Sequence, residues 1–388
     1  MEQKPHIIHL PRIYPSKFSP LSGIFFEQQV DALRSTPNLS ISVIALVQKP
    51  LLSSLFFANL RLWFKTLMHD TNNGITQITY IFSLPMPFLV KRYYINLRCY
   101  WRIKKHVKKQ GKPNLIHLQT YEMGIAALWV KKRLDIPYIV TEHSSNLYSD
   151  ATRLSKKMLS QIYLESSYNI AVSPYFANFL STKFNTKFDY IPNSVAIEKN
   201  GIKKDKNNAL IELIHVAHCV PIKQQDLLLR GFKHALYENP NVHLTIIGDG
   251  PELPKLKALA RELNITEQVT FCGTLSNEEV KYKIQESDIF ILTSKKETFG
   301  VVLIEAMAAG LPSISTKSGG PEGILTNDNL GILCDQSPTS IANAILEAST
   351  KEYNPIKIRE YAIKVFSAEA VSNQIVNIYN QVMLTNNQ

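Results

Sequence analysis

The chain is short of cysteine, and its four cysteines form no disulfide or metal-binding pattern. Cys99, Cys219, Cys272 and Cys334 are scattered, with no C-x-x-C pair and no histidine at the spacing of a zinc ligand. This pattern argues against a disulfide framework and against a structural zinc site. It is typical of a reduced cytoplasmic protein whose few thiols are small, buried side chains.

Long apolar runs are also lacking. A membrane-spanning helix needs about 18 consecutive apolar residues, and the longest candidate, residues 80–90 (YIFSLPMPFLV), is shorter and contains two prolines. The first 15 residues do not combine a basic segment with an apolar core, so we expect no secretory signal peptide. The sequence therefore predicts a cytoplasmic protein that is soluble or peripheral on the inner face of the cell membrane.

Acidic residues are scarce in the first half of the chain. The net charge is +11, and residues 1–190 hold 24 Lys+Arg against 10 Asp+Glu. The excess is concentrated in residues 131–133 and in residues 91–112, a basic segment with interspersed aromatic residues that we expect to be helical. Such a helix suits an anionic membrane or a phosphorylated ligand, and equally an ordinary solvated face. No nucleic-acid-binding motif accompanies the charge, so we expect no nucleic-acid partner.

Strand-like and helix-like segments alternate along most of the 388 residues, a length that favours two domains. Short apolar runs predict buried strands at residues 6–10, 41–46, 78–82, 115–118, 138–143, 169–173, 212–218, 242–250, 268–273, 288–294 and 312–317. Between them we expect helices, at residues 23–35, 124–134, 223–238, 252–264, 277–286 and 301–310, and a last helix at 367–383. This alternation predicts parallel sheets of right-handed βαβ units.

A polar, charged segment at residues 191–209 separates two such series and is typical of a linker. We therefore expect two doubly wound α/β domains, residues 1–190 and 191–365, followed by a C-terminal helix in residues 366–388. Ligands of doubly wound sheets bind at the carboxyl ends of the strands. Two facing sheets would accordingly bind a ligand in a cleft between the domains.

Two glutamates, Glu297 and Glu305, are separated by seven residues in the stretch SKKETFGVVLIEAMAAGLP (294–312). Gly300 allows the backbone to approach a ligand closely, and the free amides of residues 300–302 at the start of a helix make an anion site suited to a phosphate. Glu305 lies about 7.5 Å further along the helix axis, of the order of the distance from a diphosphate to its ribose. Alternatively, the two carboxylates are a helix-start residue and a surface residue paired with a lysine.

Residues 294–325 resemble the signature of family-4 retaining glycosyltransferases of the GT-B fold, an E-x7-E motif followed by A-x-G-x-P and GG-x-x-E/G turns. The resemblance covers most of the chain and includes the segments IPNSV (191–195), 215–232, 246–264 and 269–280. It implies two Rossmann-like domains facing a central cleft, with the acceptor bound by the N-terminal domain and the nucleotide sugar by the C-terminal domain. It also implies that the C-terminal helix returns to the N-terminal domain.

The resemblance assigns roles in the C-terminal domain. Glu297 would contact the donor sugar, Glu305 the ribose hydroxyls, and Lys223 the diphosphate. The backbone amides that hold the sugar and diphosphate would be those of Thr298, Phe299, Gly300, Val301 and Val302, and the loop that reads the base would contain Thr274 and Leu275. By charge and position alone, Lys223 could equally face the solvent.

The phosphate-binding segment departs from the family pattern. The usual Gly-Arg is Ala217-His218, and the glycine after the lysine is Gln224. His218 would add positive charge at the donor site only when protonated, near its ordinary pKa of about 6.5. The departure puts donor affinity and its pH dependence in question.

In the N-terminal half, Gly23 resembles the family's first glycine loop, and His143, in TEHSS (141–145), resembles a histidine that approaches the donor sugar or acceptor. The alternatives are a structural turn glycine and a structural histidine. His117 resembles another histidine of the family and is interpreted as packing or as lining the cleft.

The resemblance implies transfer of a hexosyl group from a nucleotide diphosphate sugar, with retention, to a saccharide acceptor that is lipid-linked, in bacterial surface polysaccharide (capsule or lipopolysaccharide) synthesis. Members of this family work without a bound metal or other cofactor, and no D-x-D stands at a strand end here. The alternatives are a soluble sucrose- or glucan-synthase-type enzyme, an epimerase of the same architecture, and a non-catalytic nucleotide-sugar-binding protein.

Overall fold

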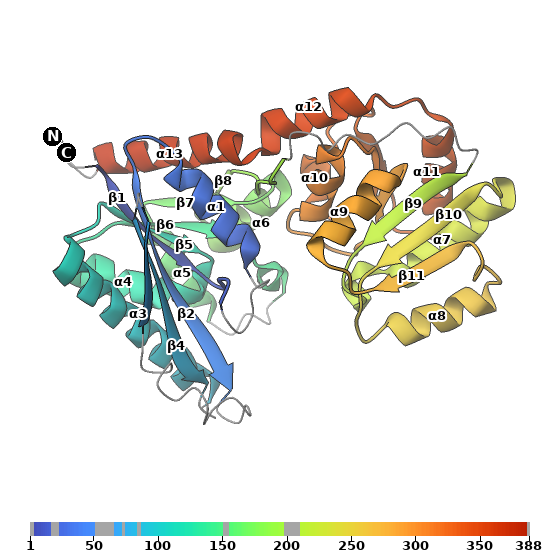
Figure 1. Cartoon of the computed structure of the whole chain (residues 1–388). Helices are drawn as coiled ribbons and strands as arrows, with labels where there is room; N and C mark the ends of the chain where they lie inside the picture. Colours follow the sequence, from blue (N-terminus) through green and yellow to red (C-terminus); the bar gives the residue numbers. More distant parts are fainter. Residues whose placement is uncertain are drawn as a thin grey trace. The chain divides into compact units, whose positions relative to one another are not determined.

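The computed structural model describes residues 4–16, 23–50, 66–71, 74–83, 87–149, 155–197 and 210–385. The chain forms two compact units (Figure 1). Unit 1 contains Met1–Val172, Ala177–Ile191 and Val371–Gln388, and unit 2 contains Ser173–Phe176 and Pro192–Ala370. Most of the predicted linker, residues 198–209, lies outside the described residues, as do residues 84–86 of the apolar run at 80–90.

Unit 1 is built on a sheet in the order β3-β4-β2-β1-β5-β6-β7-β8. Its strands are β1 (His6–Pro11), β2 (Ser40–Pro50), β3 (Thr66–Thr71), β4 (Gly74–Ser83), β5 (Leu115–Gln119), β6 (Tyr138–Glu142), β7 (Tyr168–Ala171) and β8 (Asp189–Tyr190). All neighbours pair in parallel except β3 and β4, which are antiparallel. The six strands predicted for this half are confirmed, and β3 and β8 were not predicted.

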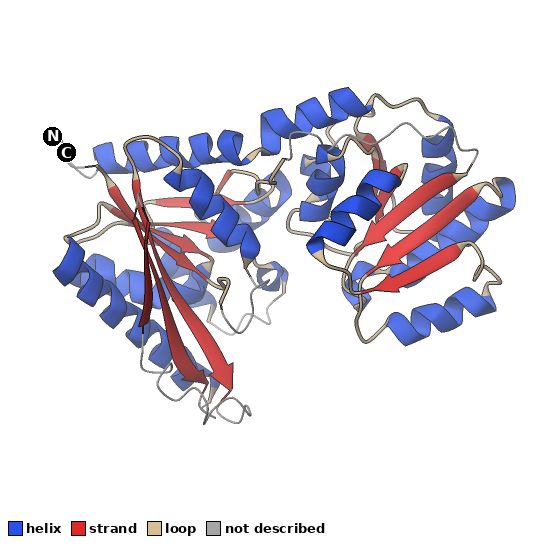
Figure 2. Cartoon of the chain, in the orientation of Figure 1, coloured by secondary structure: helices blue, strands red, loops and turns tan. Residues whose placement is uncertain are grey.

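The helices of unit 1 cover the sheet (Figure 2). They are α1 (Ile24–Arg34), α3 (Phe88–Gln110), α4 (Gly124–Leu134), α5 (Lys156–Leu164), α6 (Pro174–Phe184), whose first turn belongs to unit 2, and most of α13 (Ala368–Thr385). From α13, Val371, Ile375 and Tyr379 join the buried core formed by β1, β2 and α1. The expectation that the C-terminal helix returns to the N-terminal domain is therefore confirmed.

Unit 2 has a wholly parallel sheet in the order β11-β10-β9-β12-β13-β14. Its strands are β9 (Ile211–Val216), β10 (Val242–Ile247), β11 (Val269–Gly273), β12 (Ile289–Leu292), β13 (Ser313–Thr316) and β14 (Gly331–Cys334). Its helices are α7 (Gln225–Glu238), α8 (Leu253–Glu262), α9 (Asn277–Glu286), α10 (Val301–Ala308), α11 (Pro338–Thr350) and α12 (Pro355–Phe366). The predicted class, two doubly wound parallel-sheet α/β units, is confirmed.

One boundary in unit 2 differs from the prediction and bears on the site. The helix expected at residues 223–238 begins only at Gln225, because Gln224 has the left-handed φ of 48°. Residues 221–223 form a separate 3-10 turn, which ends at Lys223. The lysine is therefore held in a loop at the carboxyl end of β9 and does not lie on the face of a helix.

Candidate functional site

Two of the predicted donor-site residues, Lys223 and Glu297, form an ion pair in unit 2. Lys223 Nζ donates to Glu297 Oε1, and Ser294 Oγ donates to the same oxygen at 2.7 Å. The two side chains are only 23% and 13% exposed. The pairing follows from the topology: β9 and β12 are adjacent parallel strands, so the loops at their carboxyl ends lie together.

The backbone on both sides of this ion pair is fixed. Thr293, at the end of β12, is fully buried and its hydroxyl donates to the carbonyl of Lys223 at 3.2 Å. The amide of Glu297 donates to the carbonyl of Ser318 at 2.9 Å. The carbonyl of Glu297 accepts from the amide of Gly320 at 3.1 Å. The carboxylate and the ammonium group are thus presented from rigid loops, as a substrate-binding site requires.

Gly300 turns the chain from this loop into α10. Its φ of 108° is in the left-handed region, which only glycine adopts easily, and it is the N-cap residue of the helix. The first amides of α10, those of Val301 and Val302, have no intrahelical partner, and the helix dipole adds positive potential there. The side chain of Phe299 is buried against Phe366, so only its backbone is available to a ligand.

Glu305 lies on α10, beyond these amides. Burial raises the pKa of its carboxyl group to about 7, while the positive charge of Lys281 on α9 acts in the opposite direction. A carboxyl group with this pKa changes its ionisation close to neutral pH. An ionised Glu305 can accept hydrogen bonds from a pair of hydroxyl groups.

The loop with the unusual Ala217-His218 is closely packed. A Cβ at Gly248, where φ is 135°, would lie 2.0 Å from the carbonyl oxygen of Ala217. His218 is exposed, and its carbonyl accepts from Gln225 Nε2 at 3.2 Å. The loop is therefore an ordered turn despite the two replacements, and its imidazole lies at the surface.

The predicted base-reading residues follow the end of β11. Gly273, the last residue of the strand, has a φ of 66°, and its carbonyl accepts from the amide of Gly248 at 2.8 Å. Thr274 is exposed and Leu275 is half-buried. All the predicted donor residues of unit 2 thus follow the carboxyl ends of β9, β11 and β12, and the fold brings Lys223 and Glu297 into direct contact.

In unit 1, the predicted residues Gly23 and His143 belong to neighbouring elements. Gly23 is the N-cap of α1 with a φ of 83°, and a Cβ there would lie 2.6 Å from the carbonyl oxygen of Ile13. His143 follows β6, and its ring packs edge-on against Phe25 and Phe26 of α1, at centroid distances of 5.6 and 5.3 Å. Gly23 therefore has a structural reason to be glycine, whatever it binds.

His117 is fully buried, as its interpretation as a packing residue requires. Its Nδ1 and Nε2 pair with Tyr379 Oη and Thr141 Oγ1, each at 2.7 Å. Burial, with the charges of His9 and His143 as lesser causes, lowers the pKa of His117 well below its ordinary value. Its ring joins α13 to the sheet and remains neutral.

Sequence reasoning missed three polar residues that support the site: Ser294, Gln119 and Glu142. Ser294 bonds to Glu297, and Gln119 Oε1 pairs with His143 Nε2 at 2.8 Å. Glu142 is a fully buried carboxyl group directly before His143. The available signal was their position: each stands at or just after the end of a predicted strand, where doubly wound sheets bind ligands.

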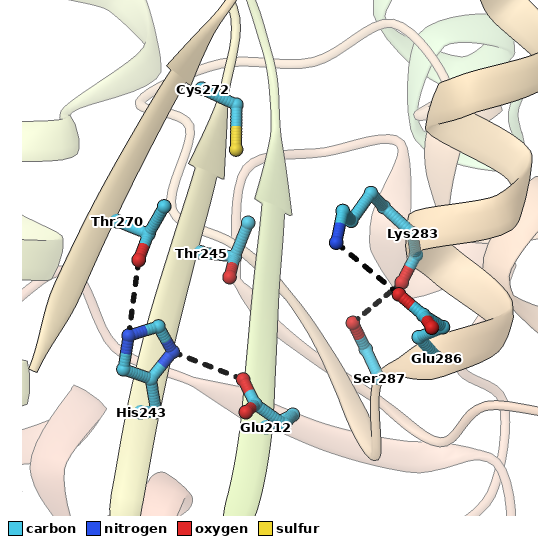
Figure 3. Close-up of a pocket in the computed structure, with 8 residues that line it drawn as sticks. All are labelled: Glu212, His243, Thr245, Thr270, Cys272, Lys283, Glu286 and Ser287. Atoms are coloured by element: carbon cyan, nitrogen blue, oxygen red, sulfur yellow. Dashed lines mark hydrogen bonds and ion pairs between the residues drawn. The ribbon is translucent and has the colours of Figure 1, made fainter.

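A separate cavity of about 210 Å³ lies in unit 2 between strands β9, β10 and β11 and helix α9 (Figure 3). His243 bridges Glu212, through Nδ1 at 3.0 Å, and Thr270, through Nε2 at 3.1 Å. Glu212 and His243 are the second residues of β9 and β10. They therefore lie toward the amino ends of the strands, whereas the predicted donor residues follow the carboxyl ends.

Within the described ranges, no group of three or more His, Cys, Asp or Glu side chains could hold a metal ion. In the same residues, none of the helices has both the length and the apolar character needed to cross a membrane.

Comparisons with known proteins identify relatives of this chain. It is 28% identical to the N-acetyl-alpha-D-glucosaminyl L-malate synthase of Bacillus anthracis, over 51% of this chain and about half (54%) of that protein. It is 26% identical to the alpha-monoglucosyldiacylglycerol synthase of Streptococcus pneumoniae, over 72% of this chain and 69% of that protein. In fold it is similar to the apo form of the lipopolysaccharide outer core galactosyltransferase WaaB, with a TM-score of 0.71 at 16% identity over 97% and 99% of the two chains.

Two family models match the chain in adjoining segments. The model for glycosyltransferase family 4 matches residues 66–199, and the model for group 1 glycosyl transferases matches residues 196–365. The second match contains both glutamates of the E-x7-E motif and the ion-paired lysine. With both models matched and the GT-B fold in place, the chain belongs to the group 1, family 4 glycosyltransferases.

Proposed function

We propose that this protein transfers a hexosyl group from a nucleotide diphosphate sugar to a lipid-linked saccharide acceptor, with retention of configuration, in bacterial surface polysaccharide synthesis. The observation that carries the proposal is the ion pair of Lys223 with Glu297 beside the N-terminus of α10. Both matched family models are of glycosyltransferases, and the two curated relatives are named for glucosaminyl and glucosyl products. These support the transfer of a hexose.

The proposed chemistry assigns each group a task. Lys223 and the amides of residues 298–302 stabilise the negative charge that develops on the leaving diphosphate. Glu297 binds the sugar hydroxyls, Glu305 binds the ribose, and His143 of unit 1 approaches the donor sugar or the acceptor. The leaving phosphate takes the proton of the acceptor hydroxyl, which attacks from the same face, so no side chain need act as a strong base. The positive charge comes from the protein itself, and we propose that no metal ion or other cofactor is needed.

We further propose that helix α3 of unit 1 holds the protein on an anionic membrane at its cytoplasmic face. Its outer side exposes large apolar residues, among them Leu89 at 58% and Trp101 at 55%. A surface groove of about 500 Å³ is lined by Arg98, Trp101, Arg102, Lys104, Lys105 and Lys108. The helix contains no Asp or Glu. Apolar and basic residues on one helix suit the interface of an anionic bilayer.

The donor site is tested by thermal shift with UDP, GDP, ADP and CMP in the presence of EDTA. A ligand at 100 times its Kd stabilises the native state by about 2.7 kcal/mol. We expect a shift with one diphosphate, lost in Lys223→Ala and Glu305→Ala and kept in the control Lys283→Ala, which removes another ion-paired lysine of unit 2. No shift with any nucleotide would refute the donor site and leave a binding protein of another kind.

Transfer itself is tested with a labelled sugar donor and lipid-linked or free saccharide acceptors. An α-linked product from an α-linked donor, identified by NMR, supports retention, and an inverted product refutes it. Activity that is equal with free sugars would favour the soluble synthase alternative. Flotation with anionic and neutral vesicles tests α3: we expect binding to anionic vesicles only, lost in Arg98→Glu/Lys105→Glu, and equal recovery in the soluble fraction would refute the membrane proposal.

A further inference from the structure

A chain of side-chain contacts in unit 1 leads from helix α1 to His143. Gln119 is the last residue of β5, and Gln29 lies on α1; they are 1% and 2% exposed. Gln119 Nε2 donates to Gln29 Oε1 at 3.0 Å, and His143 Nε2 lies 2.8 Å from Gln119 Oε1. Two buried amides and one imidazole thus form a single hydrogen-bonded series.

The direction of the series determines where the proton lies on the ring. Because Gln119 uses its NH2 group as the donor to Gln29, the atom that faces His143 is the carbonyl oxygen, which can only accept. His143 Nε2 must then carry the hydrogen. In a neutral imidazole the other nitrogen, Nδ1, holds the lone pair.

The ring is also held in place laterally. Phe25 and Phe26 of α1 meet it at interplanar angles of 71° and 89°, so both aromatic rings stand edge-on to it. Helix α1 therefore contacts the His143 assembly through Phe25 and Phe26 on the ring and through Gln29 on its hydrogen-bond partner. This is the arrangement of a supporting shell around a residue whose orientation matters.

We propose that Gln119 and Gln29 are positioning residues that hold His143 in one ring orientation and as the Nε2–H tautomer. The tautomer decides which ring nitrogen can accept a hydrogen bond from a sugar hydroxyl and which can only donate one. The inference deepens the proposed function, because it assigns the tautomer of a residue placed at the substrate. The tautomer itself can be measured whether or not the protein is a transferase.

In the part of the chain that the structure describes, the titratable groups next to His143 include Glu142 and His117. Glu142 is the preceding residue, at the end of β6, and burial raises its pKa to about 8. From β5, His117 interacts with His143 and stays neutral, as its strongly lowered pKa shows. From α1, the contacting residues Phe25, Phe26 and Gln29 carry no charge. A carboxyl group introduced at position 119 would, when ionised, form an ion pair with the protonated His143 ring, and this pairing should raise the pKa of His143.

The test is long-range 1H–15N NMR of the full-length protein labelled with 15N-histidine, with His143→Gln to assign the signals. We expect wild-type His143 to show the pattern of the Nε2–H tautomer at pH 8. In Gln119→Leu and in Gln29→Leu we expect a mixture of tautomers. In Gln119→Glu we expect the pKa rise given above. The matched control is Gln77→Glu, which alters another buried glutamine paired with a histidine, His106, in the same unit and should leave the His143 signals unchanged.

Wild-type signals of the Nδ1–H tautomer would overturn the inference directly, without any variant. Unaltered His143 signals in a folded Gln119→Leu would also overturn it. The pH profile of transfer gives a second readout, because a merely structural role of Gln119 would lower activity without moving the profile. We expect the acidic limb in Gln119→Glu to move with the pKa of His143. If NMR shows the Nε2–H tautomer but the protein has no transferase activity, this inference stands and the proposed function is refuted.

Discussion

Glu142 gives a prediction that can be worked out from its surroundings. It ends β6 directly before His143, and its carboxyl group is fully buried. Tyr163 Oη donates to Glu142 Oε1 at 2.9 Å. Burial raises the pKa of Glu142 to about 8, and this outweighs the hydrogen bond from Tyr163, which lowers it. At neutral pH the folded protein therefore holds a protonated carboxyl group beside its candidate site.

The sign and size of the effect on stability follow from linkage. In the unfolded chain the carboxyl group loses its proton near its ordinary pKa of 4.5, whereas in the folded chain it keeps the proton up to about pH 8. The folded state binds more protons in this window, so the contribution of Glu142 to stability is fully present below pH 4.5 and is lost as the pH rises toward 8. At about 1.4 kcal/mol per pH unit, the loss between pH 5 and pH 7.5 is about 3 kcal/mol.

Glu142→Gln removes the titration and keeps an acceptor for Tyr163. We expect the free energy of unfolding of the variant, relative to wild type, to rise by about 3 kcal/mol between pH 5 and pH 7.5. Urea denaturation followed by tryptophan fluorescence reports on unit 1, because all three tryptophans lie in its sequence. The control is Glu165→Gln, whose half-exposed carboxylate pairs with Lys131. The same difference between variant and wild type at both pH values would refute the reasoning.

Three further predictions concern single side chains. The pKa of Glu305 is about 7, and its ionised form accepts best from ribose hydroxyls. The affinity for the donor, measured by calorimetry, should therefore rise from pH 6 to pH 8, and Glu305→Gln should abolish that rise. Lys223→Met should lower kcat of transfer about 100-fold in a labelled-donor assay, the cost of losing one group that stabilises the leaving charge; an unchanged kcat would refute its role. Tyr379→Phe leaves His9 and His117 without their shared hydroxyl, so unit 1 should lose about 2–4 kcal/mol in urea denaturation, and a loss below about 0.5 kcal/mol would contradict this.

The elements that sequence patterns predicted are those with a clear apolar run, such as the four consecutive apolar residues of β12. Strand β8 was missed because it has only two residues, which is too short to show any alternation of apolar and polar side chains. Helices α11 and α12 were missed although each has a side-chain N-cap followed by proline, Ser337-Pro338 and Asn354-Pro355. Those signals were available in the sequence, so this part of the fold was predictable and was overlooked.

In the candidate site, too, some features could be predicted from the sequence and others could not. The motif located Glu297 and Lys223, but their contact joins residues 74 positions apart and depends on β9 lying next to β12, which the order of strands in the chain does not state. Of the partners of His143, Gln119 was indicated only by its position after a predicted strand, and Gln29 belongs to no pattern in the sequence. The hydrogen bonds of both depend on how α1 lies against the ends of β5 and β6.

The ion pair of Lys223 with Glu297 has a consequence for ligand affinity. A diphosphate that binds Lys223 must compete with the carboxylate, whereas a sugar bound by Glu297 must compete with the ammonium group. A partly exposed pair of this kind contributes up to about 1 kcal/mol. Glu297→Gln should therefore tighten the binding of the free nucleoside diphosphate by up to about fivefold, while transfer is lost.

The matched variant is Glu297→Asp, which keeps the charge but shortens the side chain. Lys223→Met should weaken the binding of the free nucleoside diphosphate. Calorimetry with the diphosphate found in the thermal-shift panel measures all three. If Glu297→Gln instead weakens the diphosphate as much as Lys223→Met does, the pair acts as a unit that orders the loop, and Glu297 does not compete for the lysine. Opposite changes in the two variants mean that Lys223 changes partner when the donor binds, so that the glutamate is released to bind the sugar only when the diphosphate is in place.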